Sequence, residues 1–270
     1  MRSSLTRKSR LISVGVVLAL AAPAALAAEC RIDPQRAGPI AAVTDGRTFV
    51  LADGRTVRLA MLEVPSANGS AIPLEGLAGA RASSAALTQL ATGQDILLTA
   101  MDTDRYGRLL ARAYFAQNGV PQWIERALVA AGHAFVSPYP TNQNCAADLI
   151  AAERVARTRK LGLWGDPYYA AKSADDPAAV LAARGRFAIV EGKVVSVRES
   201  GGTIYINFGR RWDEDFTVTI LKRNGRFLAR GDLEPKSLAG RRVRVRGVVE
   251  ERGGPWIEAI APGQIEIADR

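Results

Sequence analysis

Residues 44–65 read TDGRTFVLADGRTVRLAMLEVP, and this stretch decides the fold of the first half of the chain. Two apolar runs rich in β-branched residues, 44–51 and 56–65, flank Asp53-Gly54. Asp and Gly tolerate the positive φ of a tight turn, so the pattern predicts a β-hairpin. Strict alternation along the second strand would place three apolar side chains on one face: Val57, Leu59 and Met61.

Arg58 lies in the middle of that apolar strand, on its opposite face. A second arginine motif follows at residues 103–108, TDRYGR. A strand with Arg-Leu that ends in an acidic residue, a spacer and Pro, followed later by Asp-Arg-Tyr-Gly-Arg, resembles the thermonuclease (staphylococcal nuclease-like) family. The resemblance covers about residues 40–164 and includes two further features in the family's order, a helix ending at Gly132 and the closing Leu161-Gly162-Leu163-Trp164.

The resemblance implies a mixed α+β fold for residues 28–165, in which a five-stranded barrel of the OB type carries three helices. Periodicity and turn residues are consistent with this layout. The elements expected after the hairpin are helices at 74–90, from Pro121 to Gly132 and at 145–160, and strands at 95–100 and 109–115.

Beyond residue 165 the sequence predicts a second, smaller unit. Short alternating segments bounded by glycines occupy 187–197, 203–208, 216–220, 243–249 and 256–260. Strands of this length and spacing predict an all-β, OB-like barrel. The expected division is a signal peptide (1–27), a thermonuclease-like domain (28–165), a linker or short helix (166–184) and an OB-like domain (185–270).

The first 27 residues have the layout of a secretory signal peptide. A basic start precedes the apolar run 11–20, and Ala25-Leu26-Ala27 forms a cleavage motif. We expect export to the periplasm or the medium and no membrane span after cleavage; the alternative is an uncleaved N-terminal anchor. Removal of the segment lowers the net charge from +9 to +5, which alone supports nucleic-acid binding only weakly.

Export also gives meaning to the two cysteines, Cys30 and Cys145, since an oxidising compartment permits a disulfide. We expect the two to be joined; the alternative is two free thiols. In the loop-entropy model, closing a loop of this length stabilises the fold by about 4 to 5 kcal/mol.

The resemblance implies a phosphodiesterase site in which carboxylates hold one calcium ion, a glutamate activates water and two arginines stabilise the phosphoryl charge. Arg58 and Arg108 match the two arginines, the alternative being that they form surface ion pairs. Glu63 stands at a ligand position where the family has the shorter Asp. These three residues are the candidate catalytic group.

The metal side departs from the family pattern. Where Asp-Gly-Asp-Thr is typical, this chain has Asp45-Gly46-Arg47-Thr48, and Ser66 stands where the water-activating glutamate would follow. A fixed cation beside a divalent ion opposes its binding. The sequence therefore predicts no cofactor, with calcium only if the site is rebuilt from other carboxylates, of which Glu63 and Asp45 are the weak candidates. Glu75, from the following loop, is the candidate for the base position.

Nucleic acid, DNA or RNA, is the expected partner, and protein partners are left open. Further contacts are expected from Arg47, Arg105 and Tyr106 near the site. In the second unit three arginines alternate with valines and would share one strand face: Arg242, Arg244 and Arg246. The alternative for that face is a solvated surface balanced by nearby acids.

Three functions stay open from sequence alone. The first is an exported thermonuclease-like protein that binds phosphate or nucleic acid, with hydrolysis degraded or lost. The second is an active secreted endonuclease with a rearranged metal site. The third is an envelope module that binds protein or glycan.

Overall fold

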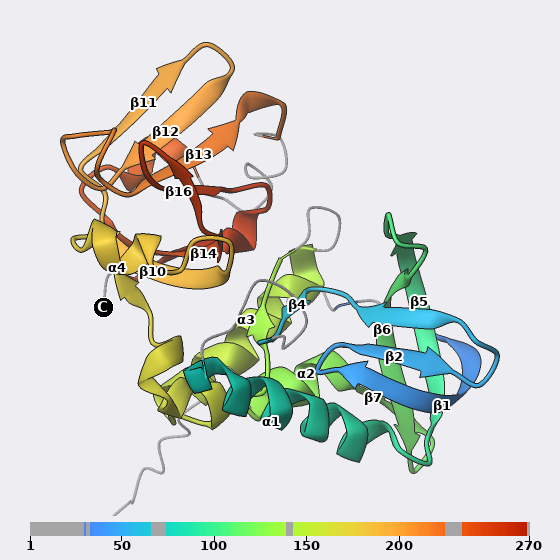
Figure 1. The fold of residues 1–270 in the computed structure, drawn as a ribbon. Helices are drawn as coiled ribbons and strands as arrows, with labels where there is room; N and C mark the ends of the chain where they lie inside the picture. The colour runs from blue at the N-terminus through green and yellow to red at the C-terminus, as the bar shows by residue number, and fades with distance from the viewer. Residues whose placement is uncertain (1–29, 31–32, 66–73, 139–142, 225–233, 269–270) are drawn as a thin grey trace, which may run out of the picture.

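The computed structural model describes residues 30, 33–65, 74–138, 143–224 and 234–268 (Figure 1). It is a mixed α+β structure with an N-terminal module and a β-rich C-terminal module. The signal peptide and Ser66 lie outside the described residues.

Five strands of the N-terminal module form a closed circuit. They are β1 (Gln35–Asp45), β2 (Thr48–Leu51), β3 (Thr56–Leu59), β5 (Asp95–Thr103) and β6 (Leu109–Gln117). β1 pairs with β2, β2 with β3, β5 with β6 and β5 with β1, all antiparallel. A parallel pairing of β3 with β6 closes the circuit. The predicted hairpin is thus confirmed, with Gly54 at φ +87° in its turn.

Three helices pack on this barrel: α1 (Leu74–Ala91), α2 (Ile124–Ala130) and α3 (Gln143–Thr158). Phe49, Leu59, Leu87, Leu128 and Leu149 are almost fully buried where strands and helices meet. Gly46 lets α1 approach the β1–β2 turn, because a Cβ at that position would lie 2.5 Å from the Cβ of Ser83.

The second strand of the hairpin does not continue to residue 65 as the alternation predicts. β3 ends at Leu59, and Met61 adopts a left-handed φ of +59°. This bend separates off the short strand β4 (Leu62–Glu63), which pairs with β8 (Phe135–Val136) instead of with the barrel. The bend therefore turns Glu63 away from the line of β3.

Pro121 does not begin a helix. It lies in the edge strand β7 (Val120–Trp123), which pairs with β6 across a turn where Asn118 and Gly119 have φ of +51° and +77°. Two left-handed residues make the tight turn that suits a hairpin, and an edge strand tolerates the missing proline N–H. The helix begins three residues later than the proline, at Ile124.

The C-terminal module repeats the pairing order of the first. Its strands are β10 (Phe187–Lys193), β11 (Ser196–Ser200), β12 (Thr203–Asn207), β13 (Thr217–Leu221), β14 (Arg242–Val248), β15 (Glu250–Arg252), β16 (Gly254–Glu258) and the short β17 (Ile265–Ile267). Antiparallel pairs β11–β12, β12–β13, β15–β16 and β10–β14 combine with a parallel β13–β16 pair. Only two residues separate β10 from β11 and only one separates β14 from β15, so these pairings also form a circuit.

The segment predicted as a linker belongs in part to this second module. β9 (Lys172–Ser173) pairs in parallel with β10, and α4 (Pro177–Leu181) buries Val180 in the second core. Ala174 and Ala183 are buried in the same core. The short helix was expected, whereas the apolar contacts that fold 172–183 onto the barrel were not.

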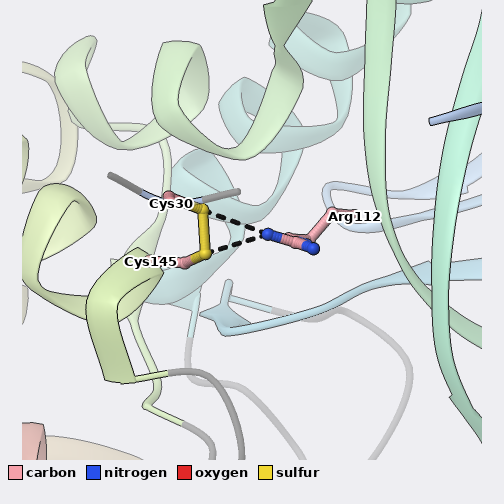
Figure 2. The surroundings of a disulfide bond; sticks show 3 residues. All are labelled: Cys30, Arg112 and Cys145. Atoms are coloured by element: carbon pink, nitrogen blue, oxygen red, sulfur yellow. Dashed lines mark hydrogen bonds between the residues drawn. A yellow bond between two sulfur atoms is a disulfide. The ribbon is translucent and has the colours of Figure 1, made fainter. Parts of the chain in front are cut away.

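The disulfide expected between Cys30 and Cys145 is present in the structure, with a Cα–Cα distance of 4.7 Å. Figure 2 shows Arg112 donating from Nη1 to both sulfur atoms, at 3.0 Å to Cys30 and 2.9 Å to Cys145. The bond ties the start of the described chain to α3. In the described part of the chain, no helix is long and apolar enough to cross a membrane.

The oxidation state and the mature start can be tested together. We expect the secreted protein to start near Ala28 and to offer no thiol to an alkylating reagent until a reductant is added, after which both cysteines react. Intact-mass measurement with and without reductant checks this. Two alkylated cysteines in the unreduced sample would contradict it.

Candidate functional site

Arg47 and Glu63 form a two-pronged ion pair at one end of the first barrel. The Nη1 and Nη2 atoms of Arg47 each lie 2.6 Å from a different carboxylate oxygen of Glu63. Nη1 also donates to the carbonyl oxygen of Leu62 at 2.6 Å. The bend at Met61 makes this geometry possible, because it brings the end of β4 to face the β1–β2 turn.

Asp45 supports the same turn from the other side. Its Oδ1 atom accepts a hydrogen bond of 2.8 Å from the backbone N–H of Arg47. The carboxylate therefore stabilises the backbone that carries Arg47.

Arg58 is half-buried and sits between two strands. Its register partners are Thr48 on β2 and Leu110 on β6. Burial and the positive charges of Arg47 and Arg108 lower the pKa of Arg58, and the carboxylates of Glu63 and Asp45 offset this only in part. Within the described ranges, Arg58 has no carboxylate at ion-pair distance.

Arg108 is held in place by its own loop. Oδ2 of Asp104 accepts from Nε of Arg108 at 2.7 Å and forms an ion pair with Nη2 at 2.7 Å. Oδ1 accepts from the backbone N–H groups of Tyr106 and Arg108. This tight loop, with Gly107 at φ +75°, fixes the direction of the guanidinium group.

An exposed aromatic ring lies beside these cations. The Tyr106 side chain is 67% exposed, and the guanidinium carbons of Arg105 and Arg108 lie 4.8 and 5.1 Å from its ring centroid. Arg105 also donates to the Tyr106 hydroxyl. The arrangement offers a flat ring next to guanidinium groups, as a nucleobase and its phosphate require.

The carboxylates described at this end of the barrel are engaged by protein groups. Both oxygens of Glu63 are taken by a guanidinium group that stands where the family pattern has a carboxylate. Among the residues that the structure describes, no group of three or more His, Cys, Asp or Glu side chains could hold a metal. The side chain of Glu75, the candidate for the base position, lies outside the described part.

The three arginines predicted to share a face of the second module have different environments. Arg246 is fully buried and ion-paired with Glu153 of α3, so its prediction as a nucleic-acid contact is wrong. Arg244 is largely buried between Glu191 and Glu266, and its guanidinium group is engaged there. Arg242 is exposed. Arg246 differs from the other two because it meets α3 of the N-terminal module, a contact that the local alternation does not encode.

Sequence reasoning missed two buried acids. Glu153 and Glu125 are both fully buried. Glu153 lies on the predicted helix α3, where a charge next to apolar neighbours is the only available signal. Glu125 is in the second position of α2, and burial raises its pKa to about 8.

Comparisons with known proteins place the resemblance on residues 56–166, which match the family model described as staphylococcal nuclease homologue. The chain is 30% identical over 167 residues to the micrococcal nuclease of Shigella flexneri, covering 58% of this chain and 86% of that protein. It is also 27% identical over 139 residues to protein ParB of Escherichia coli, covering 48% of this chain and 73% of that protein.

Proposed function

Because the chain belongs to the staphylococcal nuclease-like family, we propose that it binds the phosphates of nucleic acid at Arg58 and Arg108, with calcium-dependent hydrolysis degraded or lost. The observation that carries the proposal is Arg58, a half-buried cation whose pKa is lowered by burial and by the charges of Arg47 and Arg108 and is only partly restored by Glu63 and Asp45. A half-buried cation in such surroundings is unfavourable without an anionic partner. A phosphate oxygen would neutralise it and accept charge-assisted hydrogen bonds.

The neighbouring groups have separate roles in this proposal. Asp104 holds the guanidinium group of Arg108 in one orientation, which lowers the entropy cost of binding a phosphate. Tyr106 offers its exposed ring for stacking of a base, with Arg105 beside it. Arg47 contributes positive charge while its own hydrogen bonds go to Glu63.

The hydrolytic part of the family's chemistry is where this chain differs. Calcium takes six to eight oxygen ligands at about 2.3 to 2.6 Å. Glu63 would have to supply some of them, but both of its carboxylate oxygens are paired with the Arg47 guanidinium group. An active endonuclease with a rearranged metal site is the alternative. It is favoured by the position of Asp45 and Glu63 on either side of Arg47, and requires Arg47 to leave Glu63.

Export and the architecture of the two modules belong to the same proposal. A disulfide persists in an oxidising compartment, which supports a periplasmic or secreted protein. The shared circuit of antiparallel pairs closed by one parallel pair supports assigning both modules to the OB type.

Salt dependence tests the binding proposal. We expect the affinity for a single-stranded oligonucleotide to fall as salt rises, because each neutralised phosphate releases counterions. Replacing both Arg58 and Arg108 by Gln should lower the slope of log affinity against log salt by about 1.4, at about 0.7 for each of the two phosphates. Fluorescence titration at several salt concentrations measures the slope.

The control changes the same charge elsewhere on the module. Arg36 and Arg55 are exposed and ion-paired with Asp95 and Asp53, so Arg36→Gln with Arg55→Gln should change the slope little. An unchanged slope in the Arg58/Arg108 variant would place binding on another surface. No binding by the unmodified chain would overturn the proposed function.

A further inference from the structure

Arg246 of the C-terminal module reaches into the N-terminal module and is fully buried there. Its Nη1 atom lies 2.5 Å from Oε2 of Glu153 on α3 and 3.2 Å from the carbonyl oxygen of Val136 on β8. Its Nη2 atom lies 3.3 Å from Oε2 of Glu266 on β17, the strand that pairs with β14 in the C-terminal module. One side chain thus binds a helix and a strand of the neighbouring module at once.

These contacts hold β8 through both backbone polar groups of Val136. The N–H of Val136 donates to Oε1 of Glu153 at 2.7 Å, and its carbonyl accepts from Arg246. Apolar contacts act on the adjacent residue, because Phe135 packs with Ile189 of β10 and lies 6.1 Å from the Phe187 ring, between centroids. Both modules are therefore needed to place this two-residue strand.

β8 in turn is the pairing partner of β4. Val136 pairs with Leu62 and Phe135 pairs with Glu63. The N–H of Ser137 donates to the carbonyl of Met61 at 2.8 Å. Glu63 then holds Arg47 through both carboxylate oxygens. Direct contacts therefore run from Arg246 through β8 and β4 to the site.

We propose that Arg246 is a positioning residue: the C-terminal module fixes β8 and β4, and through them the Glu63–Arg47 pair that borders the phosphate site. The inference rests on the proposed function for its consequence, which is tighter binding of nucleic acid by the two-module chain. A buried pair such as Arg246–Glu153 suits this role, because separation of the modules would break it and leave Arg246 with Glu266 alone and Glu153 with the more distant Arg157.

The test is Arg246→Met in the full chain, which keeps the length of the side chain and removes its charge. We expect the side-chain Nε–H signal of Arg47 to shift or broaden in NMR spectra. Amide exchange at residues 62–63 and 135–137 should quicken by about tenfold or more, while β1 and β5 keep their protection. The affinity for a single-stranded oligonucleotide should fall by about 2- to 30-fold.

Two further variants keep the result interpretable. Arg246→Met with Glu153→Gln leaves no unpaired buried charge, so it should fold even if the single variant does not, and it should still perturb the Arg47 signal. Arg154→Met removes an exposed partner of Glu266 and should leave the Arg47 signal unchanged.

The outcomes separate the two ideas. An unchanged Arg47 signal in a folded Arg246 variant overturns the positioning role. A perturbed signal with unchanged affinity overturns its consequence, the tighter binding of nucleic acid. If the unmodified chain binds no oligonucleotide, the proposed function fails. The Arg47 signal then still decides whether the C-terminal module positions the Glu63–Arg47 pair.

Discussion

Replacing Arg47 by Asp together with Ser66 by Glu is expected to raise calcium-dependent cleavage of single-stranded DNA by about a hundredfold or more. In the unmodified chain we expect slow cleavage or none. The first change removes the guanidinium group that occupies both oxygens of Glu63 and supplies a carboxylate in its place. The second supplies a general base, whose contribution alone is on the order of a hundredfold.

Both changes are expected to be needed. Without the Arg47 guanidinium group, the carboxylate of Glu63 and the carbonyl of Leu62 lose their positive partner and become available to a hard cation, while Asp45 keeps its bond from the backbone N–H of residue 47. Arg58 and Arg108 can bind a phosphate in either protein, but neither can deprotonate water at neutral pH. We therefore expect the Arg47→Asp variant alone to gain calcium affinity with little cleavage.

Initial rates of oligonucleotide cleavage with calcium or with a chelator measure the effect. Arg55→Asp with Ser66→Glu is the matched control, because Arg55 is an exposed arginine in the neighbouring turn. Robust calcium-dependent cleavage by the unmodified protein, abolished by Glu63→Gln or Glu75→Gln, would show that the metal site is built from carboxylates that our proposal excludes.

The hairpin and the local setting of the two arginine motifs could be predicted because their signals are local. Asp53-Gly54 encodes a turn, and alternation places Arg58 opposite its apolar neighbours. The TDRYGR loop carries its own support, since Asp104 binds Arg108 four residues away. That these two motifs meet follows from the parallel pairing of β3 and β6, which the family resemblance implies and the spacing alone does not.

The partner of Arg47 could not be predicted in the same way. An alternating strand to residue 65 would have kept Glu63 in line with β3. The left-handed φ of Met61 turns Glu63 toward Arg47. That bend goes with the pairing of β4 with β8, which lies some 70 residues later in the chain. Non-glycine residues rarely adopt this conformation without tertiary support. Long-range pairing therefore decided the site's geometry.

The arginines of β14 show the same limit. Alternation correctly separates them from Val243 and Val245, which are buried in the second core. It cannot tell whether the opposite face meets solvent or another module. Here it meets α3, so Arg246 becomes an interface residue in place of a nucleic-acid contact.

The largest effect on stability is expected from the ionisation of Glu125 as the pH rises. Its carboxyl group is fully buried, and burial raises its pKa to about 8. Two hydrogen bonds, from its own N–H and from that of Ala113, and the charge of Arg112 lower the pKa and offset this only in part. In the unfolded chain the group ionises near its ordinary value of 4.5. Between these two values the unfolded state has lost a proton that the folded state keeps.

Rising pH therefore favours unfolding across this interval. The stabilisation from the buried neutral acid is fully present below about pH 4.5 and is lost as the pH rises to about 8, at about 1.4 kcal/mol per pH unit. From pH 5 to pH 8 the free energy of unfolding should fall by about 4 kcal/mol through this group alone. Glu125→Gln keeps the shape and an acceptor for the Ala113 N–H but cannot ionise, so it should remove this loss.

Urea unfolding of both proteins at a series of pH values isolates the effect of Glu125, because all other titrating groups are shared. We expect the two stabilities to be similar near pH 5 and the variant to be more stable by several kcal/mol at pH 8. Glu214→Gln, at an exposed carboxylate, should follow the unmodified protein at every pH. A constant difference between Glu125→Gln and the unmodified chain would mean that Glu125 ionises alike in the folded and unfolded states, and that water or Arg112 compensates its charge inside the barrel.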